Sequence, residues 1–159
     1  MATLPQLIEE DMRQLDGALR EFISQTDATA ALIIDKGGFL ITHQGDSSQF
    51  DVTTISALAS GAFMANQTIA GLVNETNFNS VYQQGEKSSM LVVNIGEHCL
   101  LIVIFSANIG VGIMRYFASG AIRKIAAQMT VAQNRNPGGG YDLSVLNIAD
   151  SGSLFRKKD

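Results

Sequence analysis

Apolar side chains recur along this chain with two kinds of spacing, and the spacings predict the order of the secondary-structure elements. Steps of three and four residues are typical of one face of an α-helix, whereas short apolar runs bounded by glycine are typical of β-strands. Both kinds alternate along the chain. The pattern predicts helices at 4–25, 51–74 and 110–133, and strands at 30–35, 39–44, 79–84, 87–95 and 99–105.

The last predicted strand indicates how these elements are layered. Residues 99–105 are Cys-Leu-Leu-Ile-Val-Ile-Phe, without a polar position. A strand that lacks a polar side is buried on both faces of its sheet, so helices are needed on both faces. Short turns at Gly85 and Gly96 join the last three strands, which indicates an antiparallel meander. The predicted fold class is therefore α/β (α+β), a sandwich of order α-β-β-α-β-β-β-α.

The middle helix carries the most unusual side chains of the chain. Asp51 is predicted to be its N-cap, and no residue from there to Glu75 has a formal charge. A helix that packs on a sheet ordinarily has charged residues on its solvent-exposed face. The absence of charge here therefore indicates that a partner surface covers that face. One apolar face is predicted to pack on the sheet: Ile55, Leu58, Ala62, Ile69 and Leu72.

The opposite face of this helix is predicted to be an interface. Its residues are small or uncharged and recur at steps of four and three, as at a helix–helix seam. Such a face costs little to dehydrate, and a second copy across a two-fold axis is the simplest partner. An alternative is that the C-terminal tail covers it. The predicted interface residues are Thr53, Ala57, Ser60, Met64, Gln67 and Gly71.

Composition and charge narrow the function classes. Apolar residues make up 46% of the chain and charged residues 16%, which excludes a disordered chain, and a net charge of −4 argues against nucleic acid as partner. The single cysteine, Cys99, excludes a disulfide framework and fits a reducing cytoplasm. The uncharged stretches 52–74 and 98–114 contain polar residues or a turn, so we expect no membrane span and a cytoplasmic location.

No catalytic constellation is apparent, so we expect no enzyme, no metal and no cofactor. His43 and His98 lack partners at metal-ligand spacing, and neither glycine cluster has the pattern of a phosphate-binding loop. Arg115, near the start of the third helix, is a candidate partner contact. The alternative for Arg115 is an exposed or ion-paired helix residue.

The hairpin Ile-Ile-Asp-Lys-Gly-Gly-Phe-Leu-Ile at 33–41 resembles that of the roadblock / dynein light-chain family. The matching positions are Asp35, Gly37 and Gly38, and the segment 108–115 resembles the approach to that family's last helix. The resemblance covers about 4–129. It implies a roadblock/profilin-like fold, with the middle helix on one face of a five-stranded antiparallel sheet and the terminal helices on the other.

The resemblance also implies a function. Family members form homodimers through the middle helices and the third strands, here 53–71 and 79–84, which adds Val81 and Gln83 to the expected interface. Prokaryotic relatives of the MglB type activate GTP hydrolysis by a small Ras-like GTPase without supplying an arginine finger. We therefore expect a non-catalytic homodimeric regulator of such a GTPase. The alternatives are a structural dimerisation scaffold and a small-molecule sensor domain.

The chain is predicted to divide into a roadblock domain at 1–134 and a tail at 135–159. Asn136-Pro137-Gly138-Gly139-Gly140 has the composition of a flexible linker. The residues after it are more apolar than an ordinary solvated tail, beginning with Tyr141 and Leu143. Docking of this tail on the domain or on a partner stays open from the sequence.

Overall fold

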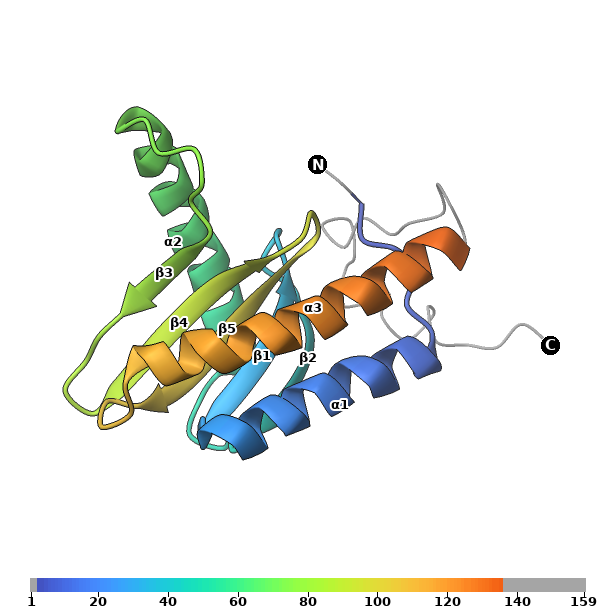
Figure 1. Cartoon of the computed structure of the whole chain (residues 1–159), viewed down its shortest axis with the longest axis horizontal. Helices are drawn as coiled ribbons and strands as arrows, with labels where there is room; N and C mark the ends of the chain where they lie inside the picture. Colours follow the sequence, from blue (N-terminus) through green and yellow to red (C-terminus); the bar gives the residue numbers. More distant parts are fainter. Residues whose placement is uncertain (1–2, 136–159) are drawn as a thin grey trace.

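The computed structural model describes residues 3–135, and the predicted tail from 136 onward lies outside the described residues. The element order is the predicted one, and most boundaries agree closely with the predictions (Figure 1). The elements are α1 (Glu9–Thr26), β1 (Ala30–Asp35), β2 (Leu40–Gly45), α2 (Val52–Leu72), β3 (Ser80–Gln83), β4 (Ser88–Ile95), β5 (Cys99–Ser106) and α3 (Val111–Arg135).

The five strands form one antiparallel sheet in the order β2-β1-β5-β4-β3. β5 is therefore central, and β2 and β3 are the two edges. Figure 1 shows α1 and α3 side by side on one face of the sheet and α2 on the other. This confirms the predicted sandwich with helices on both faces.

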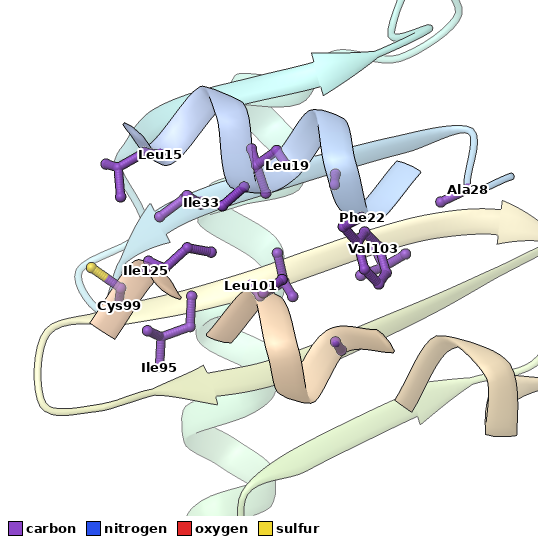
Figure 2. Close-up of a cluster of buried hydrophobic side chains, with 14 of the residues drawn as sticks. Leu15, Leu19, Phe22, Ala28, Ile33, Ile95, Cys99, Leu101, Val103 and Ile125 are labelled. Carbon is purple, nitrogen blue, oxygen red and sulfur yellow. The ribbon is translucent and has the colours of Figure 1, made fainter. Parts of the chain in front are cut away.

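The larger hydrophobic core lies between the sheet and the α1–α3 pair. Leu15 and Phe22 of α1 and Ile125 of α3 are fully buried over β5, as Figure 2 shows around Leu101 and Val103. The other face of β5 packs under α2. There Leu100, Ile102 and Ile104 form a second buried cluster with Ala59 and Phe63 of α2. All residues from Cys99 to Phe105 are buried, as the continuous apolar run predicted.

The first helix begins later than predicted, at Glu9 instead of residue 4. The backbone N–H of Ile8 donates to Asp11 Oδ2 at 2.8 Å, which ends the helix on its N-terminal side. Pro5 adds to this, because a proline disfavours helical geometry in the residue before it. Leu4 is still buried, so this apolar position packs on the core from extended chain.

Asp11 joins the start of α1 to the end of α3. Its side chain is fully buried and accepts two hydrogen bonds from the Arg135 guanidinium, at 2.8 and 2.9 Å. Gln128 Nε2 donates a further bond of 2.7 Å. The Arg135 hydrogen bonds hold the pKa of the Asp11 carboxyl at about 2, below its ordinary 3.8. Helix α3 consequently continues past its predicted end at 133 to Arg135.

We expect the Asp11→Asn variant to lose about 2 kcal/mol of unfolding free energy at pH 7, because the native carboxylate binds its proton less tightly than the unfolded one. This stability is complete above the unfolded pKa of 3.8 and is lost as the pH falls towards about 2. Urea unfolding of both proteins between pH 7 and pH 2 measures the difference, which should disappear at the acid end. Glu9→Gln, in an exposed pair with Arg13, is the control and should change little.

Candidate protein-interaction surface

Helix α2 begins where the sequence predicted, at the Asp51 cap. Asp51 Oδ1 accepts from the Thr54 N–H at 3.1 Å, and Oδ2 accepts from the Thr54 hydroxyl at 2.7 Å. The Thr54 hydrogen bonds lower the pKa of the Asp51 carboxyl, so the cap is charged. The dipole of a helix favours a negative charge at this end. This is the last charge before the chain leaves α2.

The buried side of α2 is narrow and, apart from Phe63, made of small residues. Ser56, Ala59, Ser60 and Phe63 are buried, and Ala70 follows near the C-terminal end. Ser60 was predicted on the outward face, and this is wrong. It is 5% exposed, and its hydroxyl donates to the Lys36 carbonyl at 2.7 Å, which attaches α2 to the β1–β2 turn.

The apolar face predicted to pack on the sheet is largely exposed instead. Leu58 is 69% exposed, Ile69 55% and Leu72 78%, and Ala62 is exposed as well. Of the five residues predicted to be buried, only Ile55 is partly buried against the sheet. The sequence thus led to the wrong prediction of which face of α2 is buried.

The β1–β2 turn explains this rotation of α2. Gly38 has a φ of 96°, and a Cβ there would lie 3.1 Å from the Ala57 Cα and 3.4 Å from the Ser60 Cβ. Backbone and helix approach this closely only because the turn has a glycine and the helix has alanine and serine. Ala57 and Ser60 therefore lie next to the turn, and the neighbouring Leu58 side chain is exposed to solvent.

The remaining predicted interface residues on α2 lie at the surface. Thr53, Ala57, Met64, Gln67 and Gly71 are all exposed. With Leu58, Ala62, Ile69 and Leu72, they form a wide surface that we call the α2 face. The face has no charged side chain and is broader than the single stripe predicted from the sequence.

The C-terminal half of α2 extends past the sheet in Figure 1. Its connection to the sheet is Phe63, whose ring lies 5.0 Å from the Phe78 ring in the segment that leads into β3. Beyond Phe63, Ala70 is the only residue of α2 that is buried. Within residues 3–135, most of this half of the helix is therefore exposed.

Strand β3 is an edge of the sheet, next to the extended half of α2. It pairs with β4 on one side, and no strand of residues 3–135 pairs with its other side. Val81 packs partly buried on the α2 side, and Gln83 is exposed. Tyr82 points to the opposite side, where its ring stacks on Phe105 at 6.2 Å. The strand thus has a free backbone edge directly beside the α2 face.

Arg115 is exposed, and its guanidinium donates to the Ser80 hydroxyl at 2.7 Å. The contact joins the start of α3 to the edge strand β3. Arg115 is therefore close to the free strand edge, although it is on the side of the sheet opposite to α2. It makes no ion pair with another described residue.

The two histidines considered for chemistry lie on different parts of the sheet. His43 is on the edge strand β2 with its Nδ1 3.4 Å from the Ser47 hydroxyl, and His98 is at the β4–β5 turn. Burial raises the pKa of the Cys99 thiol to about 12. Within residues 3–135, no three histidine, cysteine or carboxylate side chains are grouped to hold a metal ion. Nor does any helix in this range have the length and apolar character to cross a membrane.

Comparison with known proteins agrees with this architecture. The model of the Roadblock/LC7 domain matches residues 15–105, from the middle of α1 to the end of β5. The chain belongs to the Roadblock/LC7 family. This confirms the resemblance seen in the hairpin and in the order of the elements, and membership places the protein among non-catalytic regulators and adaptors.

Three relatives illustrate the match. The gliding protein MglB of Thermus thermophilus superposes with a TM-score of 0.74 at 25% identity, covering 82% of this chain and 99% of that one. A structure described as MglB with tetrameric arrangement has a TM-score of 0.76 at 25% identity, covering 83% and 99%. An uncharacterized protein of Methanocaldococcus jannaschii, MJ1340, is 27% identical over 71% of this chain and 97% of its own.

The contact between the turn and α2 can be tested with matched glycine substitutions. Gly38→Ala should lower the free energy of unfolding by roughly 1–3 kcal/mol, because alanine is strained at this φ and its Cβ meets the helix backbone. Gly17→Ala, in open space on α1, should raise it by roughly 0.5–1 kcal/mol. Thermal and urea unfolding measure both. Equal effects of the two substitutions would contradict the close approach of turn and helix.

Proposed function

We propose that this protein is a homodimeric adaptor that binds a small Ras-like GTPase and stimulates its GTP hydrolysis. The observation that carries the proposal is the α2 face, which is exposed, largely apolar and free of charge, beside the unpaired edge of β3 within residues 3–135. Contiguous apolar surfaces of this kind mark interaction sites in soluble proteins.

The α2 face supports self-association because its burial would be favourable and would leave no charge unpaired. Removing a side chain such as Leu58 or Ile69 from water contributes on the order of 1.5–3 kcal/mol each at full burial. Gly61 and Gly71, also exposed, allow a second helix to approach closely. In a two-fold arrangement every such contact occurs twice.

The edge strand adds a directional contact to this dimer. An unpaired edge presents backbone N–H and C=O groups that a second β3 can pair with. Such pairing would join two sheets into one, with Val81 and Gln83 on the same side as the two α2 helices. The extended half of α2 would then lie over the partner's sheet. Self-association is also recorded for a relative, in the structure described as MglB with tetrameric arrangement.

The width of the α2 face supports a second binding partner. One helix–helix seam uses a single stripe, and α2 has a stripe of small residues through Ala57 and Gly71 and a second, larger one through Leu58 and Leu72. In a dimer that uses one stripe, the other remains for the GTPase. The α2 face contains no arginine or lysine, so stimulation of hydrolysis would come from positioning the GTPase's own groups.

The dimer can be tested with Leu58→Glu. A buried, unpaired carboxylate costs several kcal/mol, and a loss of about 3 kcal/mol raises the dissociation constant of the dimer roughly a hundredfold. Sedimentation equilibrium of the full chain measures this constant. Glutamate at the exposed position Leu58 has little to disturb within the protomer, so the thermal unfolding of the monomer should be retained.

Val131→Glu is the matched control for Leu58→Glu. Val131 is also an exposed apolar residue on a helix, but it lies near the C-terminal end of α3, away from the α2 face. This variant should dimerise like the wild type. An intact Leu58→Glu dimer, or equal weakening by both substitutions, would contradict the placement of the interface on α2.

The GTPase can be tested with the small Ras-like GTPase of the same genome. We expect a complex in size-exclusion chromatography and faster GTP hydrolysis. Met64→Glu should weaken both, because Met64 is 46% exposed on the stripe through Ala57 and Gly71, which a dimer through Leu58 leaves uncovered. Complex formation without a change in hydrolysis would indicate a scaffold. Absence of any complex in either nucleotide state would exclude this GTPase as the partner.

A further inference from the structure

A cavity of about 340 Å³ lies between α1 and α3, the two helices that run side by side in Figure 1. All of its lining residues belong to these two helices. They include buried residues such as Phe22 and Ala121 and exposed ones such as Tyr116 and Arg123. Because α1 and α3 cover the face of the sheet opposite to α2, the cavity is separate from the surface proposed to bind a second copy and the GTPase.

Helix α3, which forms one wall of this cavity, has an unusual charge. From Val111 to Arg135 it contains four basic residues and no aspartate or glutamate, although the chain as a whole has a net charge of −4. Two of the four basic side chains are in ion pairs with acidic residues of α1. The other two, Arg115 and Arg123, make no ion pair with any residue of 3–135. The surface of α3 therefore has two positive charges that an acidic partner can neutralise.

The Arg123 guanidinium lies at the cavity, above Gly120. A Cβ at Gly120 would be 3.9 Å from Arg123 Nη2 and would meet no other described atom within 4 Å outside the backbone of its own helix. Gly120 thus leaves open space beside an exposed guanidinium. The planar fork of N–H donors in arginine matches the two oxygens of a carboxylate. A carboxylate that enters this space from solvent can therefore accept hydrogen bonds from Arg123.

Tyr116 gives the cavity an apolar wall. Its side chain is 74% exposed, and its ring meets the Phe117 ring edge-on, with the ring centres 5.0 Å apart. Tyrosine and arginine are the residue types that are enriched at the centres of protein–protein interfaces. An apolar side chain in the cavity would cover part of the Tyr116 ring and would gain from its removal from water.

Arg115 extends the positive surface along α3. It precedes Arg123 by eight residues, which is about 12 Å at the rise of an α-helix, and the exposed Ser119 lies between them. The hydrogen bond to the Ser80 hydroxyl, of 2.7 Å, holds the Arg115 guanidinium in place without neutralising its charge. About four residues of extended chain span the same length. Acidic residues on both sides of a short apolar segment would therefore match the two arginines.

The same surface is poorly suited to nucleic acid. Glu21 lines the cavity and forms an ion pair with Lys124, so a carboxylate is present where a phosphate backbone would have to pass. Binding of nucleic acid depends on clustered lysine and arginine residues that follow the backbone. Two arginines about 12 Å apart, with an apolar cavity near one of them, fit discrete carboxylates better.

We propose that this surface binds an acidic segment of a partner protein, with an apolar side chain of the segment in the cavity against Tyr116 and its carboxylates on Arg123 and Arg115. Arg115, a candidate partner contact from the sequence, would then contact this segment. The site does not overlap the α2 face, so a dimer could bind the segment and the GTPase at the same time.

A peptide titration of the full, isotope-labelled chain tests the site. The probe is acetyl-Glu-Asp-Glu-Phe-Leu-Asp-Glu-amide, and the same peptide with lysine at every acidic position is its control. We expect saturable shifts of the amide NMR signals of 115–124 and of Gln25 with the acidic peptide alone, and no shifts in α2. The affinity should fall as salt is raised from about 0.05 to about 0.5 M, because salt screens exposed charges. Absence of saturable shifts in 115–124, or equal shifts with the lysine peptide, would overturn the proposal.

Arg123→Glu tests the charge at the cavity. It should raise the dissociation constant of the acidic peptide roughly tenfold or more, since it replaces an attractive charge by a repulsive one. Arg20→Glu changes the net charge equally, but Arg20 is exposed on α1 and does not line the cavity. This control should bind like the wild type, and both variants should keep the thermal unfolding of the wild type. Equal weakening by both would indicate attraction by net charge alone and would overturn the site.

Gly120→Leu tests the cavity without a change of charge. The leucine side chain would fill the open space beside Arg123 and should weaken peptide binding roughly tenfold. Ala127→Leu is the control, because Ala127 is exposed further along α3 and does not line the cavity. Unchanged binding by Gly120→Leu would contradict insertion of an apolar side chain. A short oligo-dT strand that binds more tightly than the acidic peptide at the same salt concentration would overturn recognition of a protein segment.

The proposed function and this second site can fail separately. Leu58→Glu, which is expected to weaken the dimer through the α2 face, should leave the affinity for the acidic peptide unchanged. Arg123→Glu should likewise leave the dimer and the binding of the GTPase unchanged. Loss of peptide binding in Leu58→Glu would contradict a site confined to α1 and α3 of one protomer.

Discussion

The burial of β5 on both of its faces is the constraint from which the rest of this structure follows. From Cys99 to Phe105 no side chain reaches water, so each face of the central strand requires its own helical layer. The α1–α3 pair covers one face with a large core, and α2 covers the other with a smaller one. Because α2 is the only helix of residues 3–135 on its side of the sheet, much of its surface has no partner within that range, and this asymmetry is the basis of the proposed function.

The orientation of α2 follows from a backbone contact and not from its hydrophobic pattern. Gly38 and Ser60 bring the β1–β2 turn against the helix, and the Ser60 hydroxyl bond to Lys36 holds it there. Apart from Phe63, the buried residues of α2 are therefore small, and most of its large apolar residues are exposed, contrary to the usual arrangement of an amphipathic helix. Leu58 and Leu72 remain at the surface of residues 3–135, and a group of exposed apolar side chains of this kind is typical of an interaction site.

An ion pair between Asp11 and Arg135 joins the start of α1 to the end of α3. Asp11, fully buried, caps the start of α1 through the Ile8 amide and at the same time holds the final residue of α3. One carboxylate thus fixes the two helices and the point from which the chain continues. A second cavity, lined by Met129 and His98, lies beside that point, on the face of the sheet away from α2.

The local sequence by itself determined the elements and their order, the Asp51 cap and the burial of β5. It also determined the family resemblance of the hairpin. These features depend on neighbouring residues or on the environment of one strand. The local sequence also predicted an interface on α2, since a helix without charged residues is unusual on a protein surface. Only the tertiary structure decided that Ser60 is inside and Leu58 outside, and that Arg135 reaches Asp11. These features depend on contacts between segments that are distant in the sequence. Because α2 has apolar residues on most of its circumference, its periodicity cannot show which side is buried. The close approach of the helix to Gly38 decides which side it is.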